Sequence, residues 1–334
     1  MKNSLAIFFI LISLLSFNSS FGQNGINVPG GTGNYISIPS TTNNSFNGST
    51  AITVEAWVYF TGTERGGAIV CKGLGGGGES YCLDIFWESN QSSSSAKARF
   101  FVRDASSTNA FTASSNEYFT FDTWHHIAGV YYGAQVKIYL DGVLTTGQSM
   151  TTAIKGNSNI VSIGSREVSG SYSLSCTGKI DEVRIWNTAR SESDILGNML
   201  NEIPNSSYPT GLVAYYKLGT LDDEISNNDG TLVGSFGTSP YSYSAFRGLF
   251  TTDAAGEWNT NTNWSYDWSP NSLAPALRKF VDVKIEHSMT LTSDQNINGL
   301  TLNGGNINTG TYVLTIGRSV SNIGNVTVNS GYVN

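Results

Sequence analysis

Apolar positions along the chain come in short runs, separated by stretches rich in Gly, Asn, Ser and Thr. In residues 50–60 every second side chain is apolar, so one face of this segment carries Ile52, Val54, Ala56 and Val58. A period of two is typical of a β-strand with one face on a core. Trp57 and Tyr59 fall on the opposite face, which indicates that this face is partly covered as well.

Turn residues divide residues 35–216 into many such strands. Asp141-Gly142 stands between two alternating segments and predicts a hairpin with a type I′ turn. One short helix is predicted near residues 191–200, with Ser191 as its N-cap and an acidic residue three positions later. Many short strands joined by polar turns predict an all-β fold, an antiparallel sandwich.

A second pattern begins after a break near residues 239–252. Its strand-like runs end in Leu302, Ile316 and Val328, which lie 14 and 12 positions apart. Such spacing is typical of a β-solenoid, in which each coil buries its apolar edge against the next. A small antiparallel sheet explains the same residues equally well. The pattern runs to Asn334 without an evident cap, so we expect the sequence to be part of a longer protein.

The first 22 residues have the pattern of a secretion signal. Lys2 precedes the apolar run 5–15, and small and polar residues follow that run. The run is too short to span a bilayer, and no later segment approaches ~18 apolar residues. We therefore expect a secreted or outer-surface protein whose mature chain has no integral membrane segment.

Charge and composition exclude several classes of protein. Charged residues make up 13% of the chain, against roughly 25% in an average protein, which argues against a coiled coil. The net charge is −7, so no positive field attracts phosphate backbones, and nucleic acid is not an expected partner.

The three cysteines should meet an oxidising environment after export. Cys71 and Cys82 lie in two apolar runs joined by a Gly-rich connection, which predicts neighbouring hairpin strands and favours this pair for a disulfide. Three pairings are possible, and a fully reduced set is the alternative. In the favoured pairing Cys176 is a free, buried thiol. No spacing of Cys and His suggests a zinc site.

Five motifs occur in an order that resembles laminin-G-like, concanavalin A-like jelly-roll domains of secreted bacterial proteins. They are ITVEAWV at 52–58, WHHIAGV at 124–130, VKIYLDG at 136–142, GKIDEVRIWNTAR at 178–190 and GLVAYYKL at 211–218. The resemblance implies a jelly-roll β-sandwich but says little about function. Residues 250–334 resemble, more weakly, the β-rich repeats attached to such domains in exported proteins of gliding and polysaccharide-degrading Bacteroidetes.

These patterns divide the chain into four parts. Residues 1–22 are the signal, and 23–246 are the jelly-roll domain. Residues 247–275 are predicted to be a linker rich in Trp and Asn, and 276–334 an incomplete β-repeat segment.

A catalytic role is the first functional hypothesis that the resemblance raises. Glucanases of this architecture place acidic side chains on alternate positions of one strand, so that they converge on the sugar. In the nearest segment here, Cys82 occupies the position of the first acid, which leaves Asp84 and Glu88. The position that corresponds to the nucleophile therefore lacks a carboxylate, and we expect no catalytic residues. A glycoside hydrolase remains an alternative.

Binding is the favoured hypothesis, because a rigid sandwich with variable loops suits recognition of a glycan or a cell-surface protein. Trp57, Trp124 and Trp186 lie inside strand patterns and are predicted to be packed rather than free to stack on sugars. The candidate ligand-binding aromatics are Trp87, Tyr131, Tyr132 and Tyr172, although each could also be a packed residue at a strand end. We expect a non-catalytic carbohydrate-binding or adhesion module; a structural spacer without a ligand is the other alternative.

Calcium is the one cofactor that the resemblance suggests, since relatives often carry such an ion. Calcium needs six to eight oxygen ligands. Many relatives have two acids before the first strand, whereas this chain has Gly33-Asn34, which removes carboxylate charge there. The candidate ligands are therefore Asn34 and Asp181.

Overall fold

The structure is a computed structural model. It describes residues 24–40, 47, 50–61, 66–86, 95–106, 109–150, 152–238, 240–243, 249–264, 270, 278, 281–317, 320–323 and 326–327. The predicted signal at residues 1–22 lies outside the described residues.

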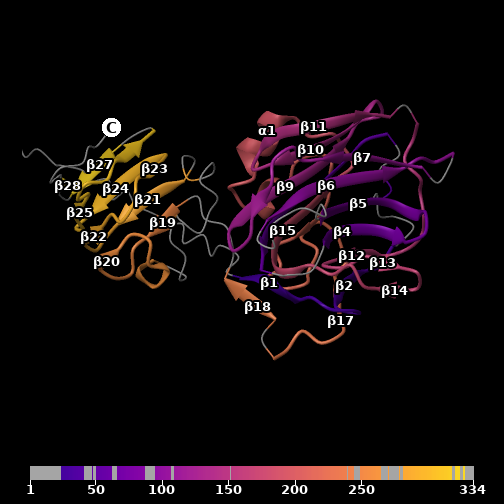
Figure 1. Cartoon of the computed structure of the whole chain (residues 1–334), viewed down its shortest axis with the longest axis horizontal. Helices are drawn as coiled ribbons and strands as arrows, with labels where there is room; N and C mark the ends of the chain where they lie inside the picture. The colour runs from indigo at the N-terminus through magenta and orange to yellow at the C-terminus, as the bar shows by residue number, and fades with distance from the viewer. Residues whose placement is uncertain are drawn as a thin grey trace, which may run out of the picture.

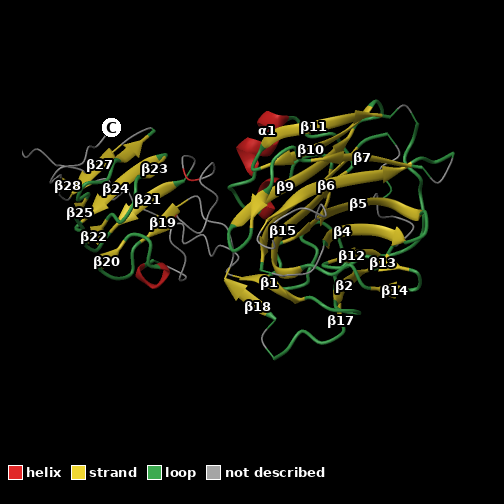
Figure 2. Ribbon diagram, in the orientation of Figure 1, coloured by secondary structure: helices red, strands yellow, loops and turns green. Residues whose placement is uncertain are grey.

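Two antiparallel sheets form a sandwich, as the strand pattern predicts (Figures 1 and 2). Sheet A has the order β11 (Val143–Ser149), β10 (Gln135–Leu140), β9 (Trp124–Tyr131), β3 (Ile52–Phe60), β15 (Thr177–Trp186), β1 (Asn24–Pro29) and β18 (Tyr241–Tyr243), and β16 (Leu212–Tyr216) also pairs with β15. Sheet B has the order β17 (Thr231–Val233), β2 (Tyr35–Ile38), β12 (Val161–Ile163), β4 (Gly67–Leu74), β5 (Gly78–Phe86), β6 (Ser95–Arg103) and β7 (Ala110–Ser114), and β8 (Phe119–Thr120) pairs with β6. The hairpin of β13 (Glu167–Val168) and β14 (Ser171–Tyr172) lies beside sheet B.

The core between the sheets follows the predicted alternation. Ile52, Val54, Ala56 and Val58 of β3 are all buried there, together with Phe100 of β6. The hairpin at Asp141-Gly142 joins β10 to β11, and both turn residues have positive φ, 53° and 78°, as a type I′ turn requires.

Trp57, Trp124 and Trp186 are buried, as predicted, but they lie on the outer face of sheet A and not between the sheets. Trp57 alternates with the core residues of β3, and its Nε1 donates to the Met199 carbonyl at 2.8 Å. The chain that follows α1 (Glu192–Asn198) provides this cover: Met199 and Leu200 pack with Trp57 and Trp124, and Ile203 packs with Trp186, just before the exposed 3₁₀ helix η1 (Asn205–Ser207). The outer face of sheet A is therefore apolar in part, and the chain that follows α1 covers it as a second packed layer.

The N-terminus of α1 is fixed as the sequence predicts. The Ser191 side chain accepts from the Asp194 amide at 3.1 Å, and the Ser191 amide donates to Asp194 Oδ2 at 3.1 Å. This capping box sets the direction in which the chain enters α1. Among the described residues no helix has the length and hydrophobicity that a membrane crossing requires.

The Cys71–Cys82 disulfide is confirmed. The two cysteines are directly opposite each other in the β4–β5 pair, which is why the hairpin pattern located them. Cys176 is free and buried, and burial raises the pKa of its thiol to about 12.

Parallel pairing distinguishes the C-terminal strands from the sandwich. One sheet is β19 (Leu249–Thr251), β21 (Asp282–Ile285), β24 (Gly299–Asn303) and β27 (Val320–Ile323); the second is β20 (Gly256–Glu257), β22 (Met289–Thr290), β25 (Ile307–Asn308) and β28 (Val326–Thr327); the third is β23 (Gln295–Ile297) and β26 (Leu314–Ile316). Each strand pairs in parallel with the equivalent strand of the next repeat, so the antiparallel alternative is wrong for these residues.

Two details of the C-terminal prediction need correction. β19, β20 and the 3₁₀ helix η2 (Asn261–Asn263) fall in the predicted linker 247–275, and Trp258 and Trp264 there are buried in the C-terminal core, so this stretch is partly folded. The repeat is also longer than predicted. Met289 pairs with Ile307, 18 positions later. The predicted spacing of 14 compared strands from two different sheets.

Candidate functional site

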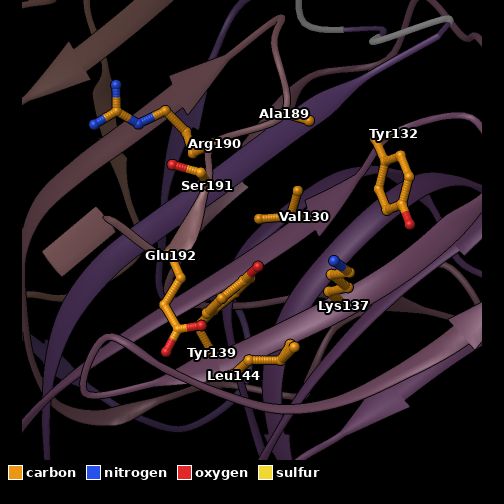
Figure 3. Close-up of a pocket in the computed structure, with 9 residues that line it drawn as sticks. All are labelled: Val130, Tyr132, Lys137, Tyr139, Leu144, Ala189, Arg190, Ser191 and Glu192. Atoms are coloured by element: carbon orange, nitrogen blue, oxygen red, sulfur yellow. The ribbon is translucent and has the colours of Figure 1, made fainter. Parts of the chain in front are cut away.

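A hollow of about 470 Å³ opens on the outer face of sheet A, beside α1 (Figure 3). Three adjacent strands form its floor, and the connection from β15 to α1 forms its wall. Its lining residues are Val130, Tyr132, Lys137, Tyr139, Leu144, Ala189, Arg190, Ser191 and Glu192.

The floor follows from strand alternation. Val136 and Ile138 of β10 point into the core, so Lys137 and Tyr139 point to the outer face. Val130 of β9 lies directly opposite Lys137 in the antiparallel pair. The site is thus built on hydrogen-bonded strands, which hold side chains more precisely than loops do.

The wall is tied to sheet A by Thr53 of β3. Its hydroxyl donates to the Thr188 carbonyl at 2.8 Å and accepts from the Arg190 amide at 3.0 Å. Together with the capping box of α1, these bonds fix the backbone from Thr188 to Glu192, which forms the wall of the hollow.

Three polar groups line the hollow without a hydrogen-bond or ion-pair partner among the described residues. Among the described residues, the Lys137 ammonium, the Tyr139 hydroxyl and the Glu192 carboxylate form no hydrogen bond or ion pair, and Figure 3 shows the Tyr139 hydroxyl pointing into the hollow. Burial, with the nearby charge of Glu192, raises the pKa of Tyr139, so this hydroxyl keeps its proton. Donors and an acceptor are therefore available to a ligand.

Tyr132 provides the exposed aromatic surface of the hollow. Its side chain is 42% exposed, and its hydroxyl donates to Gln135 Oε1 at 3.0 Å. The Lys137 ammonium lies 5.0 Å from the centre of the ring. Because one end of the ring is fixed, a ligand that stacks on it orders little additional structure.

A buried polar cluster lies on the same outer face, under the chain that follows α1. Arg184 donates to Glu182 at 2.5 Å and to the carbonyls of Asn198 and Asn201 at 3.0 and 2.6 Å. The pair supports the end of α1, because it satisfies carbonyls that the helix leaves without partners. These charges are fully covered and do not reach the hollow's surface.

Comparison with known proteins identifies the family. A laminin G family profile, described as "Concanavalin A-like lectin/glucanases superfamily", matches residues 30–196. The chain belongs to this superfamily. No curated protein matches it.

Solved structures are similar to this lectin/glucanase domain at low identity. A "putative carbohydrate binding protein" from Bacteroides ovatus is 21% identical, with a TM-score of 0.47. The match covers 63% of this chain and 59% of the Bacteroides protein, so the present chain spans about three fifths of that protein. A heptameric SAP-like pentraxin from Limulus polyphemus is 14% identical with a TM-score of 0.46, covering 64% and 94%. The CBM40 of a Ruminococcus gnavus IT-sialidase, bound to α2,3 sialyllactose, is 13% identical with a TM-score of 0.43, covering 52% and 96%.

The predicted ligand-binding residues of the lectin/glucanase domain occupy different places. Tyr132 lines the hollow, whereas Tyr131 is 1% exposed in the core, where its hydroxyl bonds to the Thr152 carbonyl and its ring is closed to a ligand. Tyr172 stacks on Tyr35 with 3.9 Å between ring centres, on the β13–β14 hairpin far from α1 (Figure 1). Trp87 lies outside the described residues.

Sequence reasoning missed Lys137, Tyr139 and Glu192. A signal for two of them was present, since alternation in the predicted hairpin strand 136–140 places Lys137 and Tyr139 together on the face opposite the core. The sequence predicts that α1 starts after Ser191, but not that this end of the helix packs beside sheet A and brings Glu192 to the hollow.

The predicted calcium ligands lie on different elements. Asn34, between β1 and β2, accepts from the Ser235 amide at 2.7 Å, and Asp181 of β15 accepts from the Glu182 amide at 2.8 Å. No group of three or more His, Cys, Asp or Glu side chains within the described ranges is placed to hold a metal ion. The two residues do not form a ready oxygen cage, so calcium stays a prediction.

The carboxylate pair considered for hydrolysis is only half visible, because Glu88 lies outside the described residues. Asp84 is buried on the outer face of sheet B, where Arg99 binds both of its oxygens at 2.7 and 2.5 Å. A carboxylate held by a bidentate arginine is not free to act on a sugar.

Proposed function

We propose that this chain is an exported, non-catalytic carbohydrate-binding or adhesion module whose ligand site is the hollow beside α1. The observation that supports this most is that one hollow holds the exposed ring of Tyr132 together with three polar groups, those of Lys137, Tyr139 and Glu192, which form no hydrogen bond or ion pair among the described residues. Membership of a lectin/glucanase superfamily agrees with this proposal but does not by itself assign a function.

The chemistry of the hollow suits a saccharide. The C–H face of a sugar packs on an aromatic ring such as Tyr132, while its hydroxyls need donors and acceptors around the edge. A volume of about 470 Å³ lies within the usual range of small-molecule sites, roughly 300–1,000 Å³. One or two sugar residues would fill such a space, with the rest of the glycan extending into solvent.

We infer that the C-terminal strands are the first coils of a β-solenoid that carries the sandwich. Three parallel sheets share one apolar interior, to which Val283, Leu300, Met289, Ile307 and Leu314 contribute. A repeat of this kind buries its apolar edge only against neighbouring repeats, which suits an extended stalk.

A glycan array with the full mature chain tests the proposed function, run in calcium and again in a chelator. We expect binding of at least one glycan class. A loss of this binding in the chelator would show that a calcium ion contributes to it. Tyr132→Ala should weaken that binding about 5- to 150-fold, if stacking of a sugar on the ring contributes as much as stacking of a nucleobase, about 1–3 kcal/mol.

Tyr312→Ala is the matched control, since Tyr312 is also exposed, at 37%, but lies in the turn between β25 and β26. It should bind like the wild type. Absence of binding to every glycan, or equal binding by both variants, would contradict the proposed site. Release of reducing sugar from a bound glycan would favour the hydrolase instead.

A further inference from the structure

Lys137 differs from four arginines of the sandwich, each of which is paired with a carboxylate. Arg99, Arg103, Arg166 and Arg184 each hold a carboxylate, with N–O distances of 2.5, 3.1, 2.6 and 2.5 Å. Lys137 is half-buried and its ammonium lies 5.0 Å from the centre of the Tyr132 ring, but no carboxylate of the described residues lies within ion-pair distance of it. An ammonium that a bound ligand covers is costly to desolvate unless the ligand itself supplies an anion.

The second cation that lines the hollow does not compete for this role. Arg190 lies against the Trp186 ring at 3.9 Å and donates to the Asp194 carbonyl at 2.9 Å. Figure 3 shows its guanidinium extending away from the other lining side chains, so only its stem contributes to the wall. Among the described residues, Lys137 is therefore the positive charge that faces the hollow.

Glu192 places a negative charge on another side of the same hollow. Its carboxylate accepts hydrogen bonds from sugar hydroxyls but repels a second anion. The net charge of −7 acts in the same direction. A densely sulfated polyanion therefore fits this site poorly, whereas a sugar with one isolated acidic group fits it well.

From this asymmetry we propose that the ligand is a carboxylate-bearing saccharide, such as a uronate, whose acidic group binds Lys137 while its hydroxyls bind Glu192 and Tyr139. The inference rests on the proposed function and adds the substrate class and the orientation of the sugar. In this orientation the sugar ring lies over the apolar side chains of Val130 and Leu144, with Lys137 on one side and Glu192 on the other.

The test uses four probes on the full mature chain: an oligogalacturonide, its methyl ester, a neutral galacto-oligosaccharide and a sulfated galactan that has no carboxylate. We expect the free acid to bind at least tenfold more tightly than its ester, the neutral sugar or the sulfated chain, because hydrogen bonds to charged groups are the stronger ones. The affinity for the acid should also fall as salt rises.

Lys137→Gln should reduce the affinity for the free acid about tenfold and leave the affinity for the methyl ester unchanged. Lys97→Gln is the matched control, because Lys97 lies on sheet B with its ammonium 4.8 Å from the Tyr118 ring. It should bind like the wild type. Folding of each variant is checked by its thermal unfolding.

The outcomes separate the two proposals. Preference for the neutral or sulfated probe, or an acid affinity that Lys137→Gln does not change, overturns this inference and leaves the proposed function standing. Binding of none of the four probes, together with an array that shows only neutral glycans, also overturns it. An array without any bound glycan overturns both.

Discussion

The Arg190 guanidinium stacks on the Trp186 indole, with 3.9 Å between Arg190 Cζ and the ring centre. The same indole donates from Nε1 to Glu55 Oε1 at 2.8 Å, so the ring joins the wall of the hollow to the buried centre of sheet A. Arg190 therefore shapes the hollow with its stem while its charge is held elsewhere (Figure 3).

Trp186→Phe keeps an aromatic surface under Arg190 but removes the donor to Glu55. A buried carboxylate that loses a donor costs about 1–3 kcal/mol, and we expect the free energy of unfolding to fall by that amount in urea. Trp258→Phe removes the same volume from a buried site where the described residues offer the indole nitrogen no acceptor. Equal losses in the two variants would show that the bond to Glu55 contributes nothing.

The fold was largely predictable from sequence, because its determinants are local. Alternation placed Val54 and Val58 in the core, Asp141-Gly142 fixed a hairpin, and the Gly-rich connection brought Cys71 opposite Cys82. In each of these, side chains a few positions apart determine which atoms meet.

The site was less predictable, because it depends on how distant segments cover sheet A. Alternation could show that Trp57 and Lys137 share the outer face, but not that the chain near Met199 covers the first and leaves the second open. Tyr131 and Tyr132 are adjacent in sequence, yet one is in the core and the other at the hollow, because successive side chains point to opposite faces of the sheet.

Removal of the disulfide should destabilise the sandwich. Cys71 and Cys82 are 11 positions apart, and closing a loop of that length contributes about 3 kcal/mol through the unfolded state. We expect the double substitution Cys71→Ala/Cys82→Ala to lower the guanidinium midpoint, as a reductant should for the wild type. In Cys176→Ala the reductant should lower the guanidinium midpoint as much as it does in the wild type. An equal wild-type midpoint with and without reductant would argue against a stabilising disulfide.

Stability should fall in mild acid because of His126. Burial and the charge of Arg184 lower its pKa from the ordinary 6.5 to about 3. Between these values the unfolded chain binds a proton that the folded protein does not, so the contribution is complete above pH 6.5 and is lost as the pH falls toward 3, by up to about 1.4 kcal/mol per unit.

Glu55, whose Oε2 lies 3.5 Å from His126 Nε2, acts in the opposite sense. Burial raises its pKa, so its contribution is largest below the ordinary value of 4.5 and declines as the pH rises through the folded value. Urea unfolding at pH 7.5 and 5.5 separates the contributions of the two residues. The wild type should lose free energy of unfolding between these pH values, and His126→Gln should remove most of that loss. An unchanged difference between the two pH values would contradict the role of His126.

Two glycines should respond in opposite directions to the same substitution. A Cβ at Gly129 of β9 would collide with the Phe100 ring across the core, and Gly129→Ala should cost about 1–3 kcal/mol through overpacking. At Gly197 of α1 nothing lies within 4 Å of the added atom, and alanine there should stabilise the protein by about 0.5–1 kcal/mol, since glycine is the more costly residue in a helix. Thermal unfolding of both variants measures the contrast. A neutral Gly129→Ala would mean that Phe100 can move aside, and that the packing of β6 against β9 is looser than these contacts indicate.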